Sequence, residues 1–335
     1  MKFGLSVPVQ HRADEPSAVR IRELLEQVRL ARDLGFHSIS ASQHYLASPF
    51  QYLQPIPLLA RIAAESGAMP LITNVLLLPL YHPVDLAEQL ATLDVICAGR
   101  LICGVGLGYR DLEYTVFGVE RATRVSRFEE ALTLIQRLWT EDEVSFAGRH
   151  FRLDHARMTL KPLQRPHPPI WIAASSDAGI RRAARLGDAW TIAGHATLAT
   201  LTQQVQLYRD TLQALGKPFP AEFPLSKELY IAPDRQTALR EAQPYLEAKY
   251  RAYSQWGQDR ELPPSETFSR PFEALARDRF ILGDPADCIA QIRAHQERLG
   301  ITHMKFRIHW PGMPHDLVMR TIRLLGEKVL PAFSS

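Results

Sequence analysis

Residues 101–110 read LICGVGLGYR, an apolar run that passes into a turn with a glycine at every second position. This pattern predicts a buried strand over 101–106 and then a turn whose backbone N–H groups can approach an anion, because no Cβ intervenes. A dinucleotide-binding fold would need G-x-G-x-x-G opening directly into a helix. Here Gly104, Gly106 and Gly108 bring the third glycine one residue early, and a long polar loop precedes the next helical pattern. The spacing therefore fits a strand that ends at the mouth of a barrel.

Short β-rich runs alternate with long amphipathic patterns on both sides of this stretch. The expected strands cover 3–7, 37–42, 70–78, 101–106, 169–173, 188–193, 225–232 and 303–310. The expected helices cover 17–34, 55–66, 84–96, 125–140, 178–186, 200–215, a segment beginning near Gln236, and 315–329. Repeated β-then-α units imply parallel strands with helical crossovers. Eight such units in 335 residues fit a (β/α)8 TIM barrel with insertions, and a doubly wound open sheet is the structural alternative.

No linker rich in glycine or serine divides the chain, so we expect residues 1–335 to form a single barrel domain. Two segments interrupt the β-then-α rhythm. Residues 141–168 contain a hairpin pattern around Ala147 and Gly148. Residues 255–280 carry several prolines without a clear period, which predicts an active-site lid or, alternatively, a surface excursion.

The composition is that of an ordinary globular protein, with 46% hydrophobic and 22% charged residues. The net charge is only +3 and no basic tract interleaves with aromatic residues, so we expect no nucleic-acid partner. The chain shows neither a signal-peptide pattern nor an apolar stretch long enough to cross a bilayer. The 3 cysteines lack metal-ligand spacing, which argues against a zinc site or a disulfide framework and favours the cytoplasm.

The chemistry of a barrel enzyme lies at the carboxyl ends of its strands. His44 follows the second expected strand and is the best candidate for acid–base work, since histidine titrates near neutral pH. The alternative is a solvent-facing loop histidine, because the chain has 12 histidines. The candidate substrate contacts mix aromatic and basic character and suit an organic molecule with an acidic or polar group. They are Tyr109, Arg307, His309 and Trp310.

Two places at helix starts could bind an anion. Ser175 and Ser176 precede the fifth expected helix, where serine is a common structural N-cap and where free N–H groups can also bind phosphate. Arg124 and Arg127 begin the fourth expected helix on one face. Cations are mildly unfavourable there, so either a bound anion or neighbouring glutamates would compensate them.

With these elements in place, the chain resembles the bacterial luciferase-like family of flavin-dependent oxidoreductases. The motifs that carry the resemblance run in the family's order from residue 1 to about 195, and the last third matches more loosely. They are Ser42-Gln43-His44, Leu78-Pro79-x-x-His82-Pro83-Val84, Leu93-Asp94, Gly99-Arg100-Leu101, Gly104-x-Gly106-x-Gly108-Tyr109-Arg110-x-x-Glu113-Tyr114, Phe117-Gly118-Val119, Arg127-x-x-Glu130-Ala131, Leu138-Trp139, Pro168-Pro169-Ile170-Trp171, Ser175-Ser176 and Ala184-x-x-Gly187-Asp188.

The resemblance implies a (β/α)8 barrel that binds reduced FMN from a separate flavin reductase and uses O2 to oxidise a small organic substrate. His44 matches the active-site histidine, and Asn74-Val75, after Thr73, match a non-proline cis peptide against which the flavin rests. The remaining cofactor contacts would come from two further walls. Ser175, Ser176, Ala178 and Gly179 match the phosphate loop, and Leu107, Gly108 and Arg124 match the second wall.

Two departures and two alternatives follow from the same resemblance. Many members carry a carboxylate before the histidine and some carry a second histidine after it. Gln43 and Tyr45 stand there in this chain, which argues against an acid–base relay through either neighbour. Members that use coenzyme F420 transfer hydride instead of activating O2, and other members bind flavin as non-catalytic partner subunits. The family also predicts a homodimer. A lysine-dependent aldolase barrel is disfavoured because Lys227 and Lys305 lie within expected strands.

Overall fold

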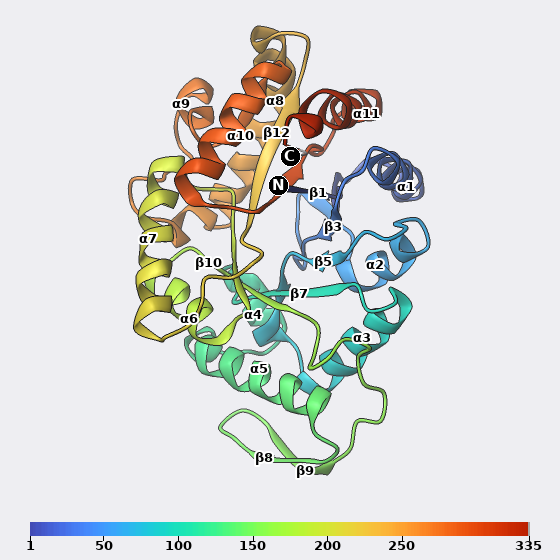
Figure 1. The fold of residues 1–335 in the computed structure, drawn as a ribbon, viewed down its shortest axis with the longest axis vertical. Helices are drawn as coiled ribbons and strands as arrows, with labels where there is room; N and C mark the ends of the chain where they lie inside the picture. The colour runs from blue at the N-terminus through green and yellow to red at the C-terminus, as the bar shows by residue number, and fades with distance from the viewer. Residues whose placement is uncertain (334–335) are drawn as a thin grey trace.

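Eight parallel strands form a closed barrel in the computed structural model, which describes residues 1–333 (Figure 1). The strands, in their order around the barrel, are β1 (Lys2–Ser6), β3 (Ser38–Ala41), β5 (Leu71–Thr73), β7 (Leu101–Gly106), β10 (Ile170–Ala174), β11 (Ala189–Ile192), β12 (Pro224–Ile231) and β14 (His303–Arg307). The barrel closes where β14 pairs with β1, with Phe3 opposite Met304. The pairing of β7 with β10 joins the two halves of the chain, so the structure is a (β/α)8 barrel and not an open sheet.

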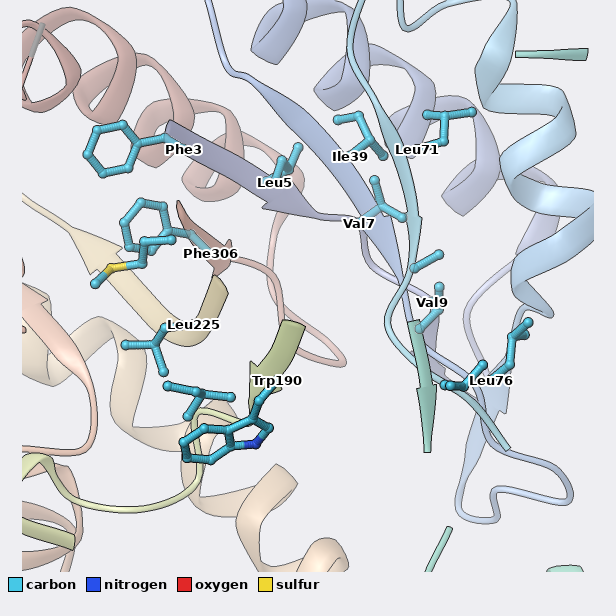
Figure 2. Packing of buried hydrophobic residues seen from close by; sticks show 14 of the residues in the cluster. Phe3, Leu5, Val7, Val9, Ile39, Leu71, Leu76, Trp190, Leu225 and Phe306 are labelled. Carbon is cyan, nitrogen blue, oxygen red and sulfur yellow. The ribbon is translucent and has the colours of Figure 1, made fainter. Parts of the chain in front are cut away.

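Helices surround the strands and bury their outward faces (Figure 1). They are α1 (Ser17–Asp33), α2 (Pro55–Ala63), α3 (Pro83–Ile96), α5 (Arg124–Thr140), α6 (Asp177–Leu186), α7 (Leu198–Ala214), α8 (Arg235–Gln255), α10 (Pro285–Leu299) and α11 (His315–Leu324). Figure 2 shows the apolar layer between strands and helices, to which Leu5, Ile39, Leu71 and Phe306 contribute. Because side chains alternate along a strand, this layer takes every second residue and leaves the others for the barrel interior.

Strand β14 shows the alternation clearly. Met304 and Phe306 lie in the outer apolar layer. His303, Lys305 and Arg307 occupy the alternate positions, and each bonds to a side chain of another strand or of the barrel mouth. The barrel interior therefore holds a column of basic side chains that leads from its amino end to its carboxyl end.

Several elements were not predicted from the sequence. A small antiparallel pair, β2 (Gln10–Arg12) and β4 (Phe50–Tyr52), stands outside the barrel sheet. A short helix α4 (Asp111–Val116) follows the glycine-rich turn. Helix α8 ends at Gln255, the first residue of the expected lid segment. The segment itself contains a 3-10 turn (Gln258–Glu261) and the short helix α9 (Phe272–Ala276). A further strand, β13 (Ile281–Gly283), pairs with β12 before α10 begins.

Three other expected elements are present, and two of them differ from the expectation in their bounds. The expected strand 70–78 is divided into β5 and β6 (Leu76–Leu77), with a 3-10 turn (Leu78–Leu80) after it. The expected hairpin is present as β8 (Val144–Ala147) and β9 (Arg152–Ala156), below α5 in Figure 1. The expected last helix ends as α11 at Leu324, followed by a π-helical turn (Leu325–Val329) and a 3-10 turn (Leu330–Phe333).

Among the helices of residues 1–333, none combines the length and apolar character that a membrane span requires.

Candidate active site

A cavity of about 230 Å³ opens at the carboxyl ends of the barrel strands. All eight barrel strands, or the loops that follow them, contribute to its lining. The lining includes Ser6, Ser42, Gln43, His44, Asn74, Val75, Gly106, Leu107, Gly108, Tyr109, Ala173, Ala174, Ser175, Ser176, Ile192, Ala193, Gly194, His195, Ser226, Lys227, Glu228 and Arg307. This end of a (β/α)8 barrel is the usual place of catalysis, because the strand-to-helix loops converge there.

The glycines of β7 allow β5 to approach it closely. A Cβ on Gly104 would lie 1.9 Å from the carbonyl oxygen of Thr73, and one on Gly106 would lie 2.8 Å from Val75 Cγ2. Thr73 Oγ1 also bonds to both the N–H and the carbonyl of Gly104, each at 2.9 Å. Of Gly104, Gly106 and Gly108, the last alone has a left-handed backbone, with φ of +82°. The glycine pattern thus serves mainly the close packing of two strands.

The peptide bond between Asn74 and Val75 is cis, as the resemblance implied. The side chain of Asn74 crosses the barrel interior: its Nδ2 donates to Ser226 Oγ at 3.2 Å, and its Oδ1 accepts from Lys305 Nζ at 2.9 Å. Lys305 also donates to Thr191 Oγ1, and burial lowers the pKa of its ammonium group to about 7. Asn74 is thus held directly from β12 and β14, and Lys305 is tied in turn to β11, while Val75 remains on the cavity wall.

His44 is paired with a buried carboxylate from a distant part of the sequence. Its Nδ1 lies 2.9 Å from Oε1 of Glu113, which is 0% exposed and belongs to α4. The same oxygen accepts from the backbone N–H of Tyr45 at 2.9 Å and lies 3.4 Å from an Arg110 guanidinium nitrogen. Because a carboxylate only accepts hydrogen bonds, His44 donates through Nδ1 and keeps Nε2 for the cavity, 3.5 Å from the Tyr109 hydroxyl.

Gln43 stands where many members of the family that the chain resembles carry a carboxylate, and it connects two loops through its amide. Its side-chain oxygen accepts from the Leu77 N–H at 2.9 Å, and its amide nitrogen donates to Gln54 at 3.1 Å and to the Tyr45 hydroxyl at 3.0 Å. Gln43 therefore anchors the loop after β3 to the segment after β5. The carboxylate that contacts the His44 ring comes instead from a residue 69 positions further along the chain.

Aromatic rings enclose His44. The rings of Tyr52, Tyr109 and Trp256 lie with their centroids 5.4–5.5 Å from the imidazole. Trp256 also covers the Arg110 guanidinium at 4.3 Å and donates through Nε1 to the carbonyl of Ser48 at 3.1 Å. Burial raises the pKa of the Tyr109 phenol well above its ordinary value, so that hydroxyl stays neutral at physiological pH.

The start of α6 combines a structural cap with a possible anion site. Ser176 is the N-cap, and its Oγ accepts from the Gly179 N–H at 3.3 Å. Ser175, Ser176, Gly179 and Arg182 line the cavity, and Arg182 Nε is 3.0 Å from Glu129. The other N–H groups of the first helical turn have no acceptor within the helix, so an anion could bind there.

Ten of the residues singled out from the sequence line this one cavity: His44, Asn74, Val75, Leu107, Gly108, Tyr109, Ser175, Ser176, Gly179 and Arg307. Five do not: Thr73, Ala178, Arg124, His309 and Trp310.

The reasons differ among those that lie elsewhere. Thr73 is fully buried against Gly104. Arg124 donates to the carbonyl of Arg121 at 3.0 Å. Arg127, the other basic residue at the start of that helix, donates to the carbonyl of Pro79 at 2.7 Å. A glutamate partner, expected as one alternative, thus holds neither arginine.

His309 and Trp310 lie behind the cavity wall. The His309 ring packs against His11 with centroids 5.6 Å apart. Trp310 is fully buried, and its indole N–H donates to Glu228 at 2.6 Å. The expected direct substrate contact through these two side chains therefore finds no support in the cavity lining.

The segment 255–280 contributes to the cavity rim. Gln258 and Glu261, in the 3-10 turn after α8, line the cavity. Glu261 forms an ion pair with Arg121 at 2.9 Å, so the segment is held to the loop that precedes α5. No repeating sequence pattern pointed to these two residues, because a single 3-10 turn is too short to have a period.

Comparison with known proteins gives one family. The luciferase-like monooxygenase family model matches residues 1–303. The F420-dependent glucose-6-phosphate dehydrogenase of Nakamurella multipartita is 29% identical over 92% of this chain and 91% of its own length. The oxygenase component of the flavin-dependent trigonelline monooxygenase of Acinetobacter baylyi is 25% identical over 100% and 96%. Monooxygenase RslO1 from Streptomyces bottropensis, a solved structure, matches with a TM-score of 0.88 and 29% identity over 100% of both chains.

Proposed function

Because this chain belongs to the luciferase-like monooxygenase family, we propose that it is the oxygenase component of a two-component flavin monooxygenase. It would take reduced FMN from a separate reductase and use O2 to oxidise a small organic substrate. The observation that carries this proposal is the full-length match, at 29% identity, to a monooxygenase of known structure. The flavin-dependent relative that is named as an oxygenase component supports the need for a reductase partner.

The donor set of the cavity fits reduced FMN. Ser175, Ser176 and the first turn of α6 would hold the phosphate, because hydroxyl and N–H donors meet the positive end of a helix there. A Cβ on Gly179 would lie 2.9 Å from the Cβ of Ala174, so a glycine is needed where that turn approaches β10. Val75 and Gly106 would form the wall behind the ring system. When bound, reduced FMN would supply the electrons that activate O2.

The side chains around His44 would perform the proton work. Glu113 fixes the imidazole so that Nε2 faces the cavity, where it can hold or move a proton at the reacting group. Trp256, Tyr52 and Tyr109 surround that ring and would limit the access of water to it once the cavity is occupied. The 255–280 segment, through Gln258 and Glu261, would act as the lid.

We also propose a cytoplasmic homodimer. The 3 cysteines are all buried and free, which suits a reducing compartment. Val95 and Ile96 near the end of α3 are 40% and 50% exposed, and burying them against a second copy would remove apolar surface from water. Light scattering tests this association, and an Ile96→Glu variant should shift the mass towards a monomer.

The second candidate function is hydride transfer with coenzyme F420. It is favoured by the 29% identity to an F420-dependent dehydrogenase over 92% of this chain. The same His44–Glu113 pair could accept the hydroxyl proton of an alcohol while its hydride leaves. The two candidates therefore share the barrel and the base and differ in the cofactor and the electron acceptor.

An anaerobic titration distinguishes the candidates. The purified protein is titrated separately with reduced FMN and with reduced coenzyme F420, and air is then admitted to each complex. Selective binding of reduced FMN, with release of H2O2 on admitting air that is slower than from free reduced flavin, supports the monooxygenase. Selective binding of reduced F420 refutes it in favour of hydride transfer. Binding of FMN with reoxidation and H2O2 release as fast as those of free reduced flavin would indicate a non-catalytic flavin-binding subunit.

A further inference from the structure

Arg307 is a cation on the cavity wall without a carboxylate partner. It is the last residue of β14, and its guanidinium nitrogens bond to the Tyr253 hydroxyl at 3.1 Å and to Ser42 Oγ at 3.3 Å. Within residues 1–333, no carboxylate oxygen lies within 4.0 Å of it. Of the five N–H donors of a guanidinium group, these two contacts leave several for another partner.

The acidic residue opposite Arg307 on β12, Glu228, already has two partners. Glu228 accepts from Lys249 through one carboxylate oxygen and from the Trp310 indole through the other. The group formed by Arg307, Lys249 and Glu228 therefore carries one excess positive charge when all three are ionised. Arginine does not lose its proton in proteins, whereas burial lowers the pKa of the Lys249 ammonium group to about 7. The excess charge is therefore present when Lys249 is protonated, and a charge away from bulk water then calls for an anion.

The other basic side chains of the lining differ from Arg307. Arg182 is paired with Glu129 at 3.0 Å. Lys227 donates to the carbonyls of Ala196 and Arg279, and burial lowers the pKa of its ammonium group to about 7, so it can become neutral. Within the described residues, Arg307 is thus the permanent cation of the lining that has no carboxylate within 4.0 Å.

Aromatic rings adjoin this cation. Ser42, which bonds to Arg307, also bonds to the Tyr52 hydroxyl at 2.6 Å, and the Tyr52 ring packs edge-on against His44 at 5.5 Å. Tyr253, the other partner of Arg307, lies with its ring 5.7 Å from that of His195. An anion bound at Arg307 would therefore leave the rest of its molecule among flat rings, next to His44.

We propose that Arg307 binds the carboxylate of a small aromatic acid and thereby selects the substrate of this enzyme. A guanidinium fork binds a carboxylate through two parallel hydrogen bonds, and the rings of Tyr52 and Tyr253 cover the planar remainder. The role of this acid as the substrate rests on the proposed function, whereas its binding at Arg307 does not.

Calorimetric titration with benzoate and benzamide tests the subsite, with FMN present and absent. The two probes have nearly the same shape and differ in charge. We expect the wild-type protein to bind benzoate at least ~10-fold more tightly than benzamide, because hydrogen bonds to charged groups are the stronger ones. Equal affinities for the two probes would overturn the proposal, and this comparison needs no variant.

Two variants separate this subsite from the phosphate site. Arg307→Met should remove the preference for benzoate and leave FMN affinity within about twofold, whereas Arg182→Met should weaken FMN and keep the preference. An unchanged benzoate preference in a folded Arg307→Met protein would refute the role of Arg307. If the wild-type protein prefers benzoate but binds no reduced FMN, the subsite stands and the proposed cofactor fails.

Discussion

Gly104→Ala is the sharpest test of how the barrel is packed beneath the cavity. The added Cβ would lie 1.9 Å from the Thr73 carbonyl oxygen and 3.0 Å from its carbonyl carbon, and both are backbone atoms. Real Cβ atoms essentially never approach a heavy atom closer than 3.0 Å, so β5 and β7 must separate locally by more than 1 Å. A backbone cannot rotate away as the end of a flexible side chain can.

The cost has two parts. Separation breaks the two 2.9 Å hydrogen bonds between Thr73 Oγ1 and Gly104, each worth about 1 kcal/mol. Overpacking of a well-packed interior adds about 1–3 kcal/mol. Together we expect a loss of about 3–5 kcal/mol. The entropy of unfolding for a chain of this length is about 0.7 kcal/mol/K, so Tm should fall by about 4–7 °C.

Thermal unfolding followed by circular dichroism measures this shift. Gly118→Ala is the matched control, because its Cβ would meet no atom within 4 Å and only its φ of +64° opposes the change. That backbone costs about 1–2 kcal/mol, or about 1–3 °C. A Gly104→Ala protein that melts no lower than Gly118→Ala would refute the claim that the glycine is there to admit the Thr73 carbonyl.

Two further changes test the site, and one tests a buried histidine of α10. Glu113→Gln should lower the free energy of unfolding by about 3–5 kcal/mol, because it leaves the buried Arg110 cation without its carboxylate. Glu120→Gln is the control and should leave stability unchanged, because Glu120 is exposed. Equal urea midpoints for the two variants would contradict this. Burial lowers the pKa of His295 to about 3, well below its unfolded value near 6.5, so protonation favours the unfolded chain. The free energy of unfolding should therefore fall as the pH falls below 6.5, by about 2 kcal/mol between pH 6.5 and 5. His295→Met should remove this loss, which urea midpoints at the two pH values measure. Trp256→Ala should uncover His44 and raise iodide quenching of bound FMN several-fold, and unchanged quenching would refute its covering role.

The barrel could be predicted because its signals are local and repeated. Each strand is a short β-rich run, each helix has a longer amphipathic period, and their strict alternation leaves few topologies. Helix α10 was not expected, although the sequence around it has the residues that begin and end helices. Asp284 caps its start by accepting from the Asp287 N–H at 2.8 Å, and Pro285 is its first residue. Gly300, with φ of +70°, follows its last residue. Expecting an irregular segment nearby hid a helix that the capping rules identify.

The placement of Trp310 could also have been found in the sequence. In and after β14, every second side chain points outward into the apolar core, and these are Met304, Phe306, Ile308 and Trp310. Arg307 occupies one of the alternate positions, which point inward, and it lines the cavity. Applying the two-residue period to the whole run would have separated these two candidates.

The partner of His44 could not be found in this way. Glu113 lies 69 residues away, in the six-residue helix α4, and only closure of the barrel brings the loops after β3 and β7 together. The sequence motif around Gly108 did contain Glu113, but a motif does not tell which side chain a carboxylate will meet. Pairings of this kind depend on tertiary structure, which periodicity does not describe.

The inward face of β14 divides two tasks between neighbouring positions. Lys305 donates to the Asn74 side chain inside the barrel. Arg307, the next inward-pointing residue of β14, lines the cavity and keeps N–H donors that its two hydroxyl partners do not use. Alternate residues of one strand stand about 6.6 Å apart, so a change at Arg307 need not disturb the wall that Asn74 supports. Asn74 is held from β12 and β14, and through Lys305 from β11, whereas within residues 1–333 the side chain of Arg307 bonds only to the hydroxyls of Ser42 and Tyr253. Such a barrel can therefore exchange its anion-binding residue, and with it the class of substrate, while the site proposed for the cofactor keeps its shape.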